Sequence, residues 1–86
     1  MNNAYELMKQ WQQNHDEPVR LDDPKGVKFY ITFDAWSRHF MVESCVGYLN
    51  FGMVYFSSQQ KAKEFLAAHE SDLKEALSEL THRYKN

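Results

Sequence analysis

The chain has 86 residues, of which 43% are hydrophobic and 15% aromatic, and ten Lys and Arg against twelve Asp and Glu give a net charge of −2. This length predicts one small α+β domain, residues 1–86, and excludes a multidomain protein. The longest apolar runs fall far short of the ~20 residues that cross a bilayer, and no basic region followed by an apolar run opens the chain. The single cysteine, Cys45, excludes an internal disulfide. We therefore expect a cytoplasmic protein with no membrane association.

A short amphipathic helix is predicted within the first fourteen residues. Apolar side chains recur there at the i, i+3, i+4, i+7 spacing of one helical face, at Ala4, Leu7, Met8 and Trp11. The helix must end before Pro18, because proline disfavours helical geometry in the residue before it. Residues 15–26 then form a polar connector that closes with the turn sequence Asp-Asp-Pro-Lys-Gly at 22–26.

Three strands are predicted after this connector. From Val27 to Asp34 apolar and polar residues alternate, a short loop follows, and alternation resumes over residues 38–44, which is typical of a β-hairpin. A third run at residues 53–56 follows a looser segment that contains Gly47 and Gly52. The simplest arrangement is a three-stranded antiparallel meander.

A final helix is predicted from Ser57 onward. Ser57 and Gln60 have the spacing of a capping box, and the apolar residues that follow are spaced by threes and fours through Tyr84. We favour one continuous helix, although Ser71 and Asp72 are good N-cap residues and leave open a break near residues 69–71. The predicted fold is α-β-β-β-α, with both helices packed on one face of the meander.

Residues 28–80 resemble small uncharacterised proteins of phages and prophages from Gram-positive bacteria. The similar element is an aromatic strand hairpin, represented here by Lys-Phe-Tyr-Ile-Thr-Phe-Asp at 28–34. It is followed by the strand Phe-Gly-Met-Val-Tyr-Phe-Ser at 51–57, which runs into a helix with an early alanine, Ala62. The resemblance implies a mobile-element origin and a cytoplasmic setting in a host cell. It implies no catalytic residue.

No pattern in the sequence indicates catalysis or a cofactor. The four histidines have no metal-ligand spacing to one another or to Cys45, and three glycines cannot form a nucleotide-binding loop. The adjacent acids at 16–17 and 22–23 lie in the polar connector, where we interpret them as solvated side chains. His69 falls on the apolar stripe of the last helix and is expected to be a hydrogen-bonded boundary residue. We expect a protein that is not an enzyme and has no cofactor.

The face of the sheet that turns away from the helices is the candidate binding site. We expect Phe29, Phe56 and the apolar residues two positions along each strand to face the helices. Strand alternation then sends four large side chains to the opposite face, namely Tyr30, Met41, Met53 and Tyr55. Tyr and Met are enriched at protein interfaces, although tyrosine is also simply a good strand former.

The leading hypothesis is a protein-interaction module that binds a host or phage protein, or a second copy of itself as a homodimer, through this open Tyr/Met face. The alternative is single-stranded nucleic-acid binding, with Tyr30 and Tyr55 stacking on bases and Lys25, Lys28 and Arg38 following the phosphates. The net charge of −2 disfavours nucleic acid as a partner.

Overall fold

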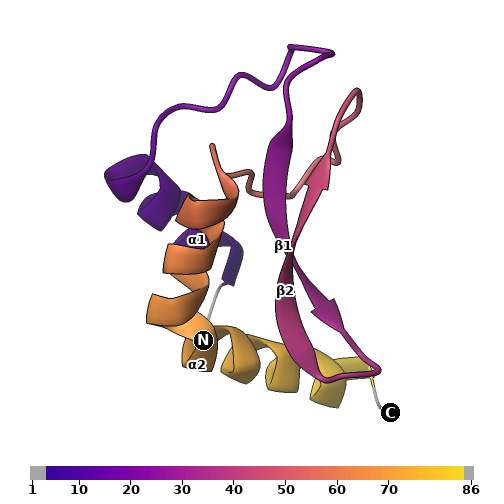
Figure 1. Cartoon of the computed structure of the whole chain (residues 1–86). Coiled ribbons are helices and arrows are strands. Elements are labelled where there is room, and N and C mark those ends of the chain that lie inside the picture. Colours follow the sequence, from indigo (N-terminus) through magenta and orange to yellow (C-terminus); the bar gives the residue numbers. More distant parts are fainter. Residues whose placement is uncertain (1–3, 85–86) are drawn as a thin grey trace.

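The computed structural model describes the backbone of residues 4–84 and the side chains of residues 4–79. The elements in chain order are helix α1 (Ala4–His15), strand β1 (Lys28–Asp34), strand β2 (His39–Cys45) and helix α2 (Gln59–Tyr84). Helix α1 and the first part of α2 lie on one side of the β1–β2 hairpin (Figure 1). The α+β class and the N-terminal amphipathic helix predicted from the sequence are therefore confirmed.

The predicted three-stranded meander is wrong, because the sheet of the described chain has two strands. Residues 53–56 touch β1 only at an isolated bridge, where Phe56 donates to the Phe29 carbonyl at 2.7 Å and Phe29 donates back at 3.3 Å. The next backbone N–H, that of Ser57, donates to the carboxylate of Asp16 at 2.8 Å. No second pair of ladder bonds joins the described part of this segment to β1.

The predicted hairpin is confirmed, and its register pairs Ile31 with Val42 and Phe33 with Phe40. The connecting loop closes when the Arg38 N–H donates to the Asp34 carbonyl at 2.7 Å, with Arg38 in the left-handed region at φ 62°. The Ser37 hydroxyl and the Trp36 N–H both donate to the Asp34 carboxylate at 3.0 Å. These bonds stabilise the charged carboxylate and lower the pKa of Asp34 below its ordinary value.

The core lies between the hairpin and the helices. Phe56, Ala62 and Phe65 are completely buried there, and Trp11 of α1 packs against both phenylalanine rings, with ring centroids 6.0 and 5.6 Å apart. Most strand residues predicted to face the helices flank this cluster, namely Phe29, Ile31, Phe40, Val42 and Val54. Phe33, also predicted to face them, packs against the Phe40 ring with centroids 5.1 Å apart. Helix α1 contributes only partly buried side chains.

The predicted capping box at Ser57 is also wrong, and Ser58 caps α2 instead. The Ser58 hydroxyl accepts the backbone N–H of Lys61 at 3.1 Å, whereas the Ser57 hydroxyl donates to the Asp16 carboxylate. The acid at residue 16, interpreted from the sequence as solvated, thus joins the end of α1 to the start of α2. The solvated interpretation is corrected by this contact across 41 positions of sequence.

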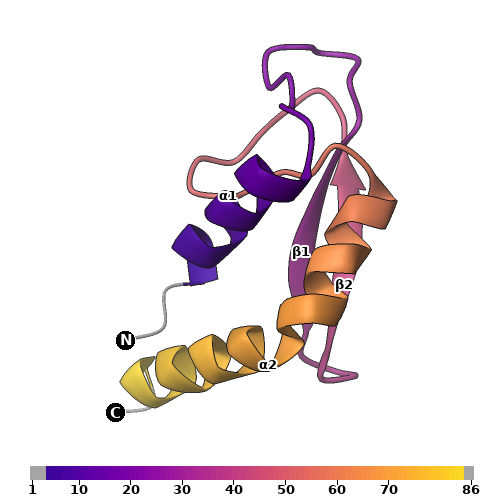
Figure 2. The same ribbon diagram turned by 90° about the vertical axis from the view of Figure 1, so that its left-hand side faces the viewer.

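Helix α2 is not continuous, contrary to the preference from the sequence. His69 has non-helical backbone angles (φ −130°, ψ 20°), which divide the element into residues 59–68 and 70–84. The first part runs along the hairpin and the second turns away from it (Figure 2). His69 is half-buried at the bend, with its Nδ1 atom 3.0 Å from a carboxylate oxygen of Asp72 and its ring 5.1 Å from that of Phe65. The expectation of a hydrogen-bonded boundary histidine is confirmed.

Candidate functional site

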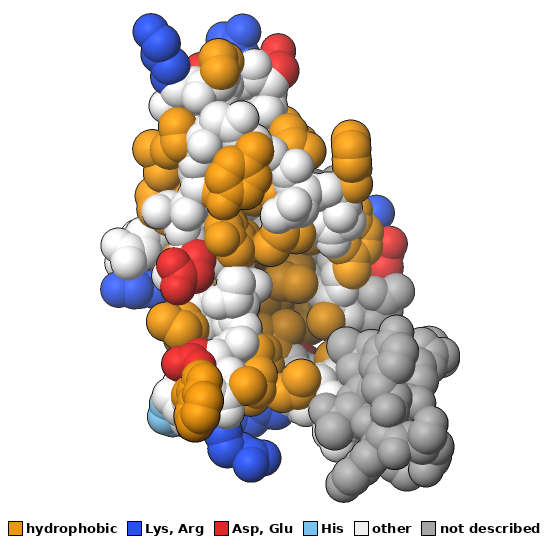
Figure 3. All heavy atoms as spheres, turned by 90° about the vertical axis from the view of Figure 1, so that its right-hand side faces the viewer, with side chains coloured by type: hydrophobic (Ala, Val, Ile, Leu, Met, Phe, Trp, Pro, Cys, Tyr) orange, Lys and Arg blue, Asp and Glu red, His pale blue; other side chains and the backbone are white. Residues whose placement is uncertain are grey.

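The candidate site lies on the outer face of the hairpin, which we define as the face turned away from the helices and which Figure 3 shows. Strand alternation places Tyr30 and Thr32 of β1 on this face, beside Met41 and Glu43 of β2. Met41 is 38% exposed and Tyr30 is half-buried. Hydrophobic side chains are spread along this side of the molecule and over the adjacent loop (Figure 3).

Tyr55 is not on an open surface, which corrects the expectation from strand alternation. Its ring packs edge-on against Tyr30, with centroids 6.0 Å apart, but only 5% of the residue is exposed. The loop of residues 46–54 folds back over it, and the Asn50 N–H donates to the Tyr55 hydroxyl at 2.7 Å. The sulfur of Met53, a half-buried residue, lies 3.9 Å from the same hydroxyl. Three of the four predicted site residues, Tyr30, Met53 and Tyr55, therefore form one cluster, in which Tyr55 is buried and contacts the other two.

Sequence reasoning missed the exposed residues of the loop at 46–54, which covers Tyr55 and is called the covering loop below. Tyr48 is 58% exposed and Phe51 is 97% exposed, and Val46 is also exposed. The signal available in the sequence was a run of large apolar residues between Gly47 and Gly52 that fits neither strand nor helix spacing. Both glycines have positive φ angles, 85° and 88°, so the loop bends sharply at these two points.

The environment of Tyr30 favours the protonated form of its hydroxyl group. Burial raises the pKa of Tyr30 above its ordinary value, and the nearby Tyr48, Cys45 and Glu43 raise it further. Tyr30 therefore offers the outer face an aromatic ring that contacts apolar groups and a hydroxyl group that donates or accepts hydrogen bonds. These are properties of a binding surface.

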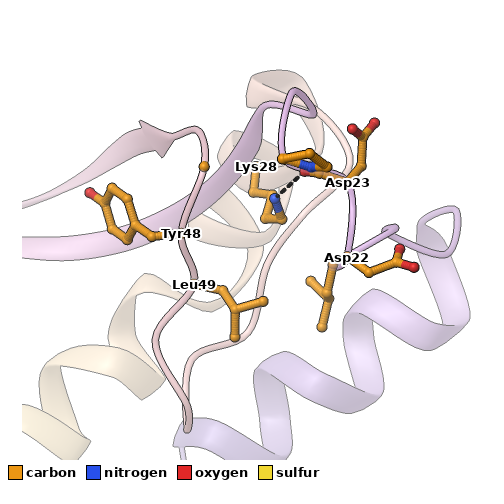
Figure 4. Close-up of a pocket in the computed structure, with 8 residues that line it drawn as sticks. Asp22, Asp23, Lys28, Tyr48 and Leu49 are labelled. Atoms are coloured by element: carbon orange, nitrogen blue, oxygen red, sulfur yellow. Dashed lines mark hydrogen bonds between the residues drawn. The ribbon is translucent and has the colours of Figure 1, made fainter.

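A small pocket of about 240 Å³ lies next to this surface, between the connector and the covering loop (Figure 4). Its lining residues are Leu21, Asp22, Asp23, Pro24, Lys28, Gly47, Tyr48 and Leu49. The ammonium of Lys28, a residue only 2% exposed, donates to the carbonyl oxygens of Asp23 and Gly26 at 3.3 and 3.4 Å. Lys28 is thus occupied in holding the turn that the sequence predicted here.

The two aspartates of this pocket do not form a carboxylate pair. Asp22 accepts a hydrogen bond from the Arg20 side chain at 3.1 Å, and a carboxylate oxygen of Asp23 accepts the Lys25 N–H at 3.0 Å. Figure 4 shows both carboxylates pointing away from the Lys28 ammonium. Each aspartate therefore stabilises the connector locally.

No group of three or more His, Cys, Asp or Glu side chains within the described residues is arranged to hold a metal ion. The described helices include none with the length and apolar character needed to cross a membrane. No family model, curated protein or solved structure matches the chain.

Proposed function

We propose that this chain is a non-enzymatic protein-interaction module that binds its partner through the outer face of the hairpin and the adjoining loop. The observation that carries the proposal is the set of large apolar side chains exposed there, Met41, Tyr48 and Phe51. Apolar residues that gather on a surface instead of standing singly mark interaction sites more often than free surface. The aromatic ring and sulfur chemistry of this set is typical of protein interfaces.

The proposal includes a phage or prophage origin and a cytoplasmic setting in the host cell. Both rest on the resemblance of residues 28–80 and on the unpaired cysteine. The partner is then a host protein, a phage protein or a second copy of the chain.

The arrangement does not favour single-stranded nucleic acid, so we do not extend the proposal to it. Lys28 is buried and bonded to carbonyl groups, which removes one of the three cations expected to follow phosphates. Lys25 precedes β1 and Arg38 follows it, so the other two lie at opposite ends of the strand. Tyr55 is buried against Tyr30 and offers no free ring face for a base.

Site-specific photo-crosslinking tests the proposal. Replacing Tyr48 with photoreactive benzoylphenylalanine in chain produced inside bacterial cells should give a discrete covalent adduct, because this side chain is exposed on the proposed surface. The matched control is the same replacement of Tyr5, an exposed tyrosine on α1. The adduct mass tells a second copy from a foreign protein. Equal labelling from both positions, or none from Tyr48, would contradict the proposal.

A further inference from the structure

Strand β2 has an outer edge whose backbone groups point away from the hairpin. In an antiparallel pair, successive residues turn their N–H and C=O groups alternately toward and away from the neighbouring strand. Phe29 of β1 uses both groups to bond Phe56, so they point away from β2. The register of the hairpin then turns the backbone N–H and C=O groups of Phe40, Val42 and Ser44 outward on β2.

No other segment in the described part of the chain forms backbone hydrogen bonds with this edge. Four of the seven residues of β2 are exposed, against none of the seven in β1. No backbone hydrogen bond from another described segment reaches Phe40, Val42 or Ser44. An unpaired edge of this kind is a template for pairing with another strand, and a lone two-stranded sheet gains stability from further strands.

We propose that the partner at this edge is a second copy of the chain, with β2 pairing antiparallel to β2 about a two-fold axis through Val42. The proposal rests on the proposed function as an interaction module and adds the edge of β2, beside the outer face, as the surface that binds a second copy. Val42 is the central residue of β2, so this register uses the whole strand. Phe40 of each copy then bonds Ser44 of the other, Val42 bonds Val42, and a four-stranded sheet crosses the dimer.

The side chains fit this register. Met41 of one copy lies opposite Glu43 of the other, and His39 lies opposite Cys45, so no like charges face each other directly. Phe40 and Val42 lie on the helix side of the sheet, where both pack against the core cluster, so pairing joins the two cores. Because the edge is self-complementary, one contact about a two-fold axis gives hydrogen-bond partners to the backbone groups of both copies.

Analytical ultracentrifugation with three variants tests the register. Met41→Glu places a carboxylate opposite Glu43 twice in each dimer and should weaken dimerisation about tenfold. The neutral control Met41→Gln should retain most of the dimerisation affinity of the unchanged chain. The double variant Met41→Glu, Glu43→Lys pairs opposite charges across the axis and should restore the dimer.

Amide hydrogen exchange gives a second readout that does not depend on variants. The outward N–H groups of Phe40, Val42 and Ser44 should exchange slowly only at concentrations where the dimer forms. The inward N–H groups of Met41 and Glu43 should be protected at every concentration. Concentration-dependent protection on β1 instead, or no rescue by the double variant, would overturn the proposal. If the chain is strictly monomeric but still crosslinks a foreign protein through position 48, the dimer proposal is refuted and the proposed function is still supported.

Discussion

The link between Asp16 and Ser57 should be among the most sensitive polar contacts of the fold. The Asp16 carboxylate accepts the Ser57 N–H at 2.8 Å, the Ser57 hydroxyl, and the N–H of Glu17 at 2.7 Å. Hydrogen bonds to a charged group contribute about 1.5–3 kcal/mol each. Water reaches both half-buried partners and compensates part of the loss, so Asp16→Ala should lower the free energy of unfolding by about 2 kcal/mol. That is a large share of the ~5–15 kcal/mol that stabilises a typical domain.

Urea unfolding followed by tryptophan fluorescence measures this loss. Trp11 packs against Phe56 and Phe65, while Trp36 is 97% exposed, so a Trp36→Phe background makes the signal report on the core alone. Glu17→Ala is the matched control, because this exposed neighbour contributes only backbone hydrogen bonds. A loss at Asp16 below about 0.5 kcal/mol, within the range of ordinary surface substitutions, would refute the reasoning.

Four further outcomes are expected. Phe56→Ala should lower the free energy of unfolding by about 3–5 kcal/mol, because the ring is completely buried, and a loss under 2 kcal/mol in denaturant titrations would contradict its place in the core. Ser58→Ala should remove the acceptor of the Lys61 N–H and cost about 1 kcal/mol by the same assay, and a neutral result would exclude Ser58 as the cap. Arg38→Gly should raise the melting temperature, since glycine adopts φ 62° without the strain of about 1 kcal/mol that other residues incur. The lowered pKa of Asp34 contributes stability above the ordinary value of 3.8, and this stability is lost as pH falls through the lower folded value. Asp34→Asn should therefore cost more stability at pH 6 than at pH 2, and equal losses at the two values would show that the carboxylate is not preferentially stabilised.

Sequence patterns predicted the elements whose formation depends on residues close together in the chain, namely the hairpin, α1 and the turn before β1. Strand alternation gave the hairpin and the side chains that face the helices, because a period of two leaves only one way to bury Phe29 and Ile31 together. The 3.6-residue period gave α1, whose apolar residues pack against the core as expected. Turn chemistry at residues 22–26 was also confirmed, since Gly26 donates to the Asp23 carbonyl at 3.2 Å.

Distant contacts decided the features that the sequence did not reveal. Residues 53–56 have good strand propensity, yet they pair with β1 at one bridge only, and the next residue, Ser57, binds a carboxylate 41 positions away. The Ser57 hydroxyl donates to the same carboxylate, which removes it from its expected capping role. At the candidate site, alternation placed Tyr55 on the correct face but could not show that the loop would bond its hydroxyl through Asn50. Neither contact produces a repeating pattern of residues in the sequence from which it could be predicted.

The bend at His69 matches the length of a long helix to a short sheet. At 1.5 Å per residue, the 26 residues of α2 would measure about 39 Å if straight, nearly the full 41 Å extent of the molecule. A strand of seven residues spans only about 23 Å. A straight helix would therefore carry about two fifths of its length past the hairpin, where no strand lies beside it. Turning at one residue brings Leu73 into the same core as Phe65, where Leu7 and Met8 of α1 also pack, so one core serves both parts of the helix.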